Sequence, residues 1–323
     1  MPSLSLPRRI AVAALLAPCL ARAQEGWPGR PLRLIVPGPA GGAADVLARL
    51  VAERLAPRLG QTMVVENRPG AGTNIGMTAV ARAAPDGYTL GVGSIASNAI
   101  NRWLYKSLPF DPERDFTPIG LIALVPNLMV VGPALPVRDV AGFIAYAKAH
   151  PGALNYGSIG AGSSQHLAGV QFGLATGIGM QHVPYSGTGP LNTDLMEGRV
   201  QVVFQSSSAV AELVRAGRMR ALAVSGVERQ PGFPEVPTLR EQGVDIVSTG
   251  WFGLVTPTGV PEPILDRLNR ELVGVLEEPE LRARIIAGGS IPRPTSRQAF
   301  AQWMAAESAR WREVVAATGA TAE

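Results

Sequence analysis

Cysteine is almost absent from this chain: its 323 residues contain only Cys19, so no internal disulfide is possible. A chain of this length can instead be held together by an apolar core. Histidine occurs only as His150, His166 and His182, without metal-ligand spacing, and no GxSxG motif is present. These absences argue against a metal site, a cysteine nucleophile and the nucleophile elbow of serine hydrolases, and no cofactor is expected.

The first 23 residues have the order of a secretory signal: the pair Arg8-Arg9, the apolar run Ile10–Ala17, and the small-residue site Ala21-Arg22-Ala23. We predict cleavage before Gln24 and a periplasmic location. The apolar run is far shorter than the ~20 residues that a membrane-spanning helix needs. Lipidation at Cys19 is disfavoured by the proline before it, and the arginine pair leaves twin-arginine export open beside the general route.

Excess positive charge is small. The formal net charge of +4 falls to 26 basic against 25 acidic residues when the three arginines of the signal are set aside. Nearly all of the basic residues are arginines, and they form no run with interleaved aromatic residues. Nucleic-acid binding is therefore not expected.

Short apolar runs rich in β-branched residues alternate with helical patterns, which predicts an α/β fold with parallel sheets and helices on both faces. The length suggests about two domains. Strands are expected at residues 32–36, 63–65, 89–92, 119–125, 128–131, 200–204, 221–224 and 252–255. Helices are expected at residues 44–58, 137–149, 164–176, 190–197, 262–276 and 297–318.

Capping residues indicate where several helices begin and end. Asp45 is expected to be the N-cap of the helix at 44–58, and Gly60 follows its C-terminus. Pro261 and Pro263 open the helix at 262–276, and Pro279 is expected to close it.

A glycine-rich loop at residues 37–45 follows the first strand and leads into the first long helix. A helix start leaves backbone N–H groups unpaired and carries roughly half a positive charge, so it suits a carboxylate or phosphate. The alternative interpretation is a tight turn capped by Asp45. Because Asp45 is negative, we expect it to bond to loop amides and fix their direction rather than contact a carboxylate directly.

A second loop of this kind follows the strand at residues 154–156, and its glycines alternate with Ser158, Ser163 and Ser164. Hydroxyls and bare N–H groups can hold a carboxylate without a countercharge, so this loop also predicts ligand contact. His166 is expected on the first turn of the following helix. A buried histidine bonded to the loop explains it at least as well as a ligand contact.

Two other motifs are weaker. The glycine cluster at residues 66–76 follows a strand, but its GxGxxxG spacing disfavours a dinucleotide site. Ser163 or Ser164 with His166 imitates a catalytic dyad without an evident third member. A serine hydrolase remains the less favoured alternative.

Many short motifs resemble, in the same order along the chain, the Bug family of periplasmic solute-binding proteins of tripartite tricarboxylate transporters. The matching segments are Trp27-Pro28, residues 31–37, Gly41-Gly42-Ala43-Ala44-Asp45, residues 66–72, residues 85–90, residues 156–158 with Gly160 and residues 162–167, His182-Val183-Pro184-Tyr185, Val236-Pro237-Thr238 and Trp251-Phe252-Gly253. The resemblance extends over nearly the whole chain after the signal.

The resemblance implies a type II periplasmic-binding-protein fold, a Venus flytrap of two α/β lobes that closes on a small organic acid and is not an enzyme. Lobe 1 is expected to comprise residues 24–125 and 229–323, and lobe 2 residues 126–228, with residues 1–23 as the signal peptide. The resemblance favours one set of ligand contacts most strongly: Ala40, Gly41, Gly42, Ser163 and Ser164.

Further candidates complete the predicted ligand site. They comprise Asp45, Ser158, Gly160, Gly162 and His166 in the two loops, and Ser97, Asn98, Gln205 and Ser206 at strand ends that face the expected cleft. The strand-end residues are candidates for setting specificity.

This chain departs from the family pattern after Tyr185. A lysine or arginine is frequent in the family there, whereas this chain has Ser186-Gly187-Thr188. The change favours a less charged or aromatic acid, or concerns only a surface side chain. The expected partners are the membrane subunits of a transporter and the protein itself is expected to be monomeric. A receptor that signals to a sensor kinase remains an alternative use of the same pocket.

Overall fold

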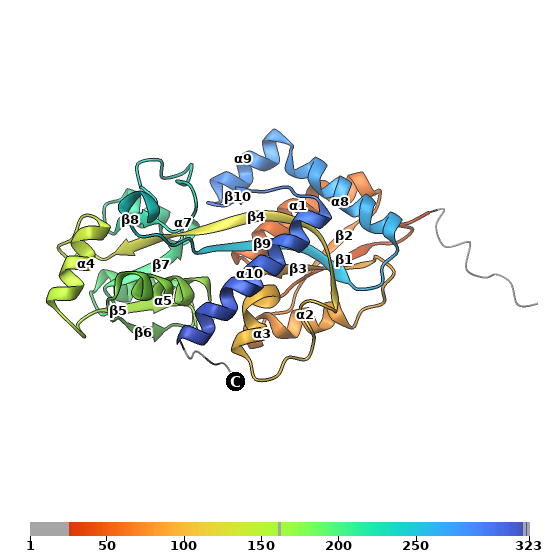
Figure 1. Ribbon diagram of the computed structural model, residues 1–323. Coiled ribbons are helices and arrows are strands. Elements are labelled where there is room, and N and C mark those ends of the chain that lie inside the picture. Colours follow the sequence, from red (N-terminus) through yellow and green to blue (C-terminus); the bar gives the residue numbers. More distant parts are fainter. Residues whose placement is uncertain (1–25, 161–162, 319–320, 322–323) are drawn as a thin grey trace, which may run out of the picture.

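The computed structural model describes residues 26–160, 163–318 and 321, so the signal segment with Cys19 lies outside the described residues. Strands and helices alternate along the chain (Figure 1). The strands are β1 (Leu32–Val36), β2 (Met63–Asn67), β3 (Thr89–Ser94), β4 (Phe116–Val131), β5 (Asn155–Ser158), β6 (Gln181–Pro184), β7 (Val202–Ser206), β8 (Arg220–Val224), β9 (Thr249–Pro257) and β10 (Ile291–Pro292).

The main helices are α1 (Ala43–Leu59), α2 (Asn74–Ala81), α3 (Asn101–Leu104), α4 (Val140–Ala149), α5 (Ser164–Thr176), α6 (Thr188–Met196), α7 (Ser207–Arg215), α8 (Glu262–Leu276), α9 (Pro279–Ala287) and α10 (Arg297–Thr318). Short helical turns η1 (Ala71–Thr73), η2 (Ala96–Ile100, a π-helical turn) and η3 (Arg240–Gln242) complete the chain. Within the described residues no helix combines the length and apolar character needed to cross a membrane.

The strands follow the order β2-β1-β3-β9-β4-β7-β5-β6, and β8 and β10 also pair with β4. β1, β2 and β3 are parallel, as are β5, β6 and β7, whereas β4 and β9 run antiparallel to their neighbours. In Figure 1, β4 and β9 cross the middle of the molecule between the group containing α1, α2 and α8 and the group containing α4 and α5. These two groups are the lobes of the predicted α/β fold.

β4 differs from the sequence expectation, which placed separate strands at 119–125 and 128–131. It is one strand that pairs with β9 as far as Pro126 and with β7 from Asn127 onward. Pro126 and Asn127 do not end the strand, because the side chains of Ser225 and Gln230 form hydrogen bonds with the backbone there in place of bonds to a neighbouring strand. The Asn127 N–H donates to Ser225 Oγ at 3.0 Å, and Gln230 Nε2 donates to the Pro126 carbonyl at 2.7 Å.

Two helix boundaries also correct the expectations. α1 begins at Ala43 with Gly42 as its N-cap, so Asp45 lies inside the first turn rather than at the cap. Pro279 does not close a helix but opens α9, because a first-turn proline needs no N–H donor. Gly60 does end α1, in the left-handed conformation with φ of 76°.

Each lobe buries apolar residues on both faces of its sheet. In the first lobe one layer lies between the sheet and helices α1 and α8, and the other contains Trp251, Phe300 and Trp311, all fully buried. Leu167 of α5 belongs to this second layer. A helix from the other half of the chain therefore packs into the first lobe at the start of α5.

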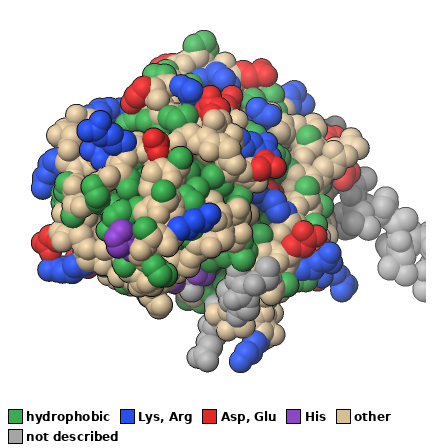
Figure 2. Space-filling model, turned by 60° about the vertical axis from the view of Figure 1, so that its left-hand side comes forward, with side chains coloured by type: hydrophobic (Ala, Val, Ile, Leu, Met, Phe, Trp, Pro, Cys, Tyr) green, Lys and Arg blue, Asp and Glu red, His purple; other side chains and the backbone are tan. Residues whose placement is uncertain are grey.

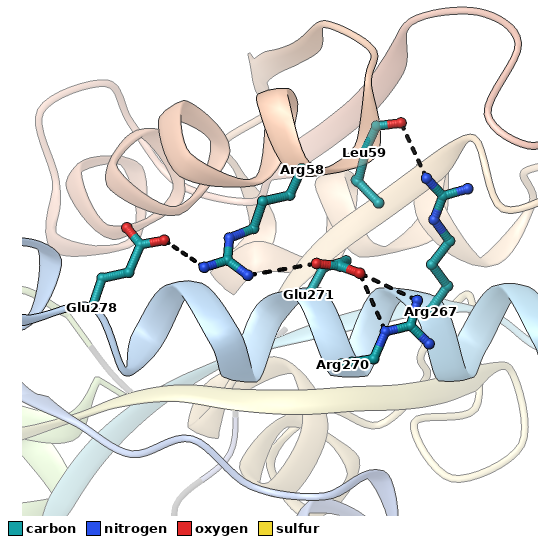
Figure 3. A network of polar contacts seen from close by, with 6 residues as sticks. All are labelled: Arg58, Leu59, Arg267, Arg270, Glu271 and Glu278. Atoms are coloured by element: carbon teal, nitrogen blue, oxygen red, sulfur yellow. Dashed lines mark hydrogen bonds and ion pairs between the residues drawn. The ribbon is translucent and has the colours of Figure 1, made fainter.

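Ion pairs join the N-terminal helix α1 to the C-terminal helices α8 and α9. Arg58 lies between Glu278, at 2.7 Å, and Glu271, at 3.6 Å, and Arg270 also contacts Glu271 (Figure 3). Arg267 donates to the carbonyl oxygen at the end of α1, that of Leu59. Segments more than 200 residues apart thus form one body.

Candidate functional site

The predicted site residues lie where strands end and helices begin. β1 and β3 are parallel neighbours, as are β5 and β7, so within each pair the segments that follow the strands lie at the same edge. In α/β folds this edge is where ligands bind.

The first loop, residues 37–42, is shaped by its glycines. Gly41 has φ of 76°, a conformation that L side chains rarely adopt, and Gly42 is extended at the start of α1. Ala40 and Gly41 are exposed, and Gly42 is half-buried. The N-cap residue Gly42 has no side chain that could accept from the first backbone N–H groups of α1, so α1 has no side-chain cap at its start.

Asp45 lies beneath this loop and is 3% exposed. One of its carboxylate oxygens accepts from the Gly41 N–H at 2.9 Å and from Arg49 Nε at 3.0 Å, and the other accepts from Asn67 Nδ2 at 3.0 Å. Burial acts to raise the pKa of Asp45, but the hydrogen bonds from Arg49, Gly41 and Asn67 outweigh it and lower the pKa below its ordinary value. The carboxylate is therefore ionised and bonds to the loop.

The second loop is held by its own hydroxyls. Ser158 Oγ and Ser163 Oγ both donate to the Gly160 carbonyl, at 3.0 and 2.7 Å. Ser163 is the N-cap of α5 and accepts from the His166 N–H at 3.2 Å. The hydrogens of these two hydroxyls are thus engaged inside the loop. The neighbouring candidate Gly162 lies outside the described residues.

A cluster of three rings lies behind the second loop. His166 and His182 have ring centroids 4.2 Å apart, and both approach Tyr156. Ser158 Oγ lies 2.7 Å from His182 Nε2. Burial, with a smaller effect of His182, lowers the pKa of His166 to about 4, and burial raises the pKa of Tyr156 to about 12. At neutral pH the cluster is uncharged.

This arrangement gives little support to the hydrolase alternative. Ser158, the serine hydrogen-bonded to a histidine ring, is fully buried and bonds to the loop backbone. Ser163 meets the backbone of His166, not its ring. Among the described residues no group of three His, Cys, Asp or Glu side chains could hold a metal ion.

Ser164, at the first position of α5, lies against the two strands that pass between the lobes. Asn127 Nδ2 of β4 is 3.5 Å from Ser164 Oγ, and a side chain at Gly250 of β9 would meet Ser164 at 3.7 Å. Next to it, Gln165 Nε2 contacts Gln205 Oε1 of β7 at 3.4 Å. The start of α5 is thus brought together with β4, β7 and β9.

The strand-end candidates differ in their exposure. Ser97, Asn98 and Gln205 are at most 2% exposed, and the side-chain amide nitrogens of Asn98 and Gln205 have no partner among the described residues. Ser206 is half-buried, and its hydroxyl lies 3.3 Å from that of Ser208. Asn98 and Gln205 therefore carry donors that no other described residue of the protein uses.

Sequence reasoning missed three polar residues of this region. Asn67 bonds to the first loop, Asn127 lies against Ser164, and the hydroxyl of Thr249 is buried without a partner among the described residues. Asn127 had a readable signal, since it is the polar residue of an otherwise apolar run. In the sequence alone this residue is equally compatible with a break between two strands.

The face of the molecule in Figure 2 carries scattered Lys and Arg side chains interspersed with Asp and Glu. No stripe of charge of one sign runs across this face, so it has no extended electrostatic potential that would attract a highly charged polymer.

Comparison with known proteins identifies the family. Residues 47–320 match the family model described as the tripartite tricarboxylate transporter family receptor. BugT of Bordetella pertussis is 37% identical over 313 residues, covering 96% of this chain and 95% of that protein.

Two solved structures from Rhodopseudomonas palustris are similar throughout. Rpa4515, solved with adipate, has a TM-score of 0.83 and 38% identity, and the match covers 92% of this chain and 99% of that one. MatC, with bound malate, has a TM-score of 0.78 and 34% identity over 90% of this chain and 100% of that one. The predicted resemblance and the two-lobed fold are confirmed, and the family consists of receptors rather than enzymes. This chain belongs to the tripartite tricarboxylate transporter receptor family, the family of periplasmic solute-binding proteins that includes the Bug proteins.

Proposed function

We propose that this protein captures a small organic acid by holding one carboxylate jointly between the loop at residues 37–42 and the loop at residues 158–164. The observation that carries the proposal is the pair of glycine loops, one at the start of α1 and one at the start of α5. Each presents backbone N–H groups and the positive end of a helix dipole. Two structures of similar proteins contain adipate and malate, which supports a ligand of this class.

The carboxylate is held without a cation. Neither loop contains lysine or arginine, and the nearby Arg49 is paired with Asp45. Amide N–H groups, the hydroxyl of Ser164 and water serve as donors, so the solute binds reversibly.

The two lobes take part in closure. We divide them as residues 24–125 with 229–323 and residues 126–228, and the change of partner along β4 at Pro126 and Asn127 supports this division. A ligand that contacts both loops stabilises the closed arrangement over the open one. The loaded protein, a monomer exported by its first 23 residues, then delivers the acid to the membrane subunits of its transporter.

The test is a melting-temperature screen with mono-, di- and tricarboxylates and aromatic acids, followed by calorimetry. A ligand at 100 times its Kd stabilises the folded state by about 2.7 kcal/mol. Gly42→Val should abolish this stabilisation, because a side chain there would crowd the Pro39 carbonyl and cover the start of α1. The control is Gly179→Val, at an exposed glycine with open space around it. Equal ligand-induced shifts in both variants would contradict the proposal.

A further inference from the structure

A compact polar cluster lies at the end of β3 and in the turn η2, and consists of Ser94, Ser97 and Asn98. All three residues are at most 4% exposed. The Ser94 N–H donates to Ser97 Oγ at 3.0 Å and to Asn98 Oδ1 at 3.2 Å, and Ser97 Oγ donates to Asn98 Oδ1 at 2.6 Å. These side chains bond to one another, and among the described residues no Lys or Arg side chain bonds to them.

The orientation of the Asn98 amide follows from these bonds. A backbone N–H can only donate, so the side-chain atom that faces Ser94 N is the carbonyl oxygen. The NH₂ group therefore points away from the cluster. It is buried and has no partner among the described residues. Buried amide donors are nearly always bonded in native proteins, so this one calls for an acceptor that the described part of the chain does not supply.

The cluster lies beside the proposed carboxylate site. β3 is parallel to β1, with Ile35 opposite Gly91, so the segment after β3 lies next to the first loop. Ile95 and Ala99, on either side of Asn98 in sequence, share a core layer with Leu167 of α5. The helix that starts at the second loop thus contributes to the core layer behind the cluster.

The chemistry favours an uncharged acceptor. The carboxylate at the two loops is stabilised by two helix starts, whereas the helical segment formed by η2 and α3 begins at a capped end, where the Ser97 N–H donates to Ser94 Oγ at 3.2 Å. A second carboxylate buried against a neutral amide, without a countercharge, would be strongly disfavoured relative to water. A carbonyl or amide oxygen accepts from one N–H of the Asn98 amide without bringing a second charge into the protein.

We propose that Asn98 Nδ2 donates to a neutral hydrogen-bond acceptor on the solute, so that the preferred ligands are monocarboxylic acids carrying a carbonyl or amide oxygen beyond the carboxylate. Ser97 is a positioning residue: its hydroxyl holds the Asn98 amide and does not contact the solute. The inference rests on the proposed function, since it assigns a contact to the part of the solute that the two glycine loops do not bind.

The test uses acids in matched sets of equal length, straight-chain and aromatic, whose far end is a methyl, a ketone or primary amide, a carboxylate or an ammonium group. Calorimetry on the full mature protein should show the ketone or amide member binding at least about tenfold more tightly than the methyl and carboxylate members. Asn98→Asp exchanges the donors for an acceptor while retaining an oxygen for Ser94 and Ser97. It should reverse the preference toward the ammonium member.

Asn101→Asp is the matched control. Asn101 is as buried as Asn98, but its Nδ2 donates to the Gly72 carbonyl and to Asn74 Oδ1, both at 2.8 Å. This variant should lower the melting temperature without ligand and leave the order of affinities unchanged. Ser97→Ala should reduce the ratio of affinities between the amide and methyl members, a change that a purely structural role would not produce.

The outcomes separate the two proposals. Equal or tighter binding of the dicarboxylate member, or an unchanged order in Asn98→Asp, overturns the assignment of Asn98 and leaves carboxylate capture intact. Failure of every acid in the panel to bind overturns both. If Asn98→Asp does not fold, the affinity order of the unaltered protein still decides the ligand class.

Discussion

Acidification should destabilise the protein through His166. Burial lowers the pKa of this side chain to about 4, whereas the unfolded chain titrates near the ordinary value of 6.5. Between these two values the unfolded state binds a proton that the folded state resists, so protons favour unfolding. The stabilisation by neutral His166 is therefore complete above about pH 6.5 and is lost as the pH falls toward 4.

The size of the effect follows from the same two values. Going from about pH 7.5 to about pH 5, the difference in proton binding amounts to about 2 kcal/mol of unfolding free energy. This corresponds to a fall of about 3 °C in melting temperature for a domain of this size. The pKa of His182 is lowered by burial in the same direction and adds to the total loss.

Urea denaturation across this pH range, followed by tryptophan fluorescence, measures the effect. His166→Gln should lose about 2 kcal/mol less stability than the unaltered protein between about pH 7.5 and pH 5. The control is His150→Gln at the exposed end of α4, which should retain the full loss. If His166→Gln and the unaltered protein lose the same stability, the buried neutral His166 is not the cause.

Three further changes test the core, the first loop and the helix network. Phe300→Ala should cost about 3–5 kcal/mol in urea denaturation, because the ring is fully buried edge-on to Trp251 at 5.6 Å; a loss under about 1 kcal/mol would contradict this packing. Asn67→Ala should weaken carboxylate binding by about tenfold in calorimetry, since it frees Asp45 and the Gly38 carbonyl, and unchanged affinity would remove Asn67 from loop support. Glu271→Gln should cost under about 1 kcal/mol at low salt and less at high salt; a larger, salt-independent loss would show a packing role.

Local sequence patterns correctly predicted the helix ends and loops that depend on neighbouring residues in the chain. α1 ends at Gly60 because a left-handed cap favours glycine, and α8 begins at Glu262 with Pro263 in its first turn because a first-turn proline needs no N–H partner. The two glycine loops were placed for the same reason. Both lie between a strand and a helix start, as expected.

Features that depend on distant partners could not be predicted in this way. The continuity of β4 across Pro126 depends on Gln230 and Ser225, about 100 residues away in the sequence. Pro279 is equally compatible with ending one helix or starting the next, and packing decides. In the second loop, composition showed that hydroxyls are abundant, but only the fold shows that Ser158 and Ser163 direct theirs to one carbonyl.

The path of β4 through both lobes constrains how the protein can unfold and evolve. Residues along this strand contribute to all four core layers: Ile119 and Leu121 to the two of the first lobe, and Leu128 and Met129 to the two of the second. Register shifts between Pro118 and Gly120 and between Leu121 and Ala123 place Ile119 and Leu121, two residues apart, in different layers. One inserted residue near Pro126 would likewise exchange the two faces of β4 in the second lobe. The number of residues in β4 up to Pro126 therefore sets which side chains face which core layer in the second lobe. Because both lobes contain part of β4, loss of packing in one lobe disturbs a strand of the other.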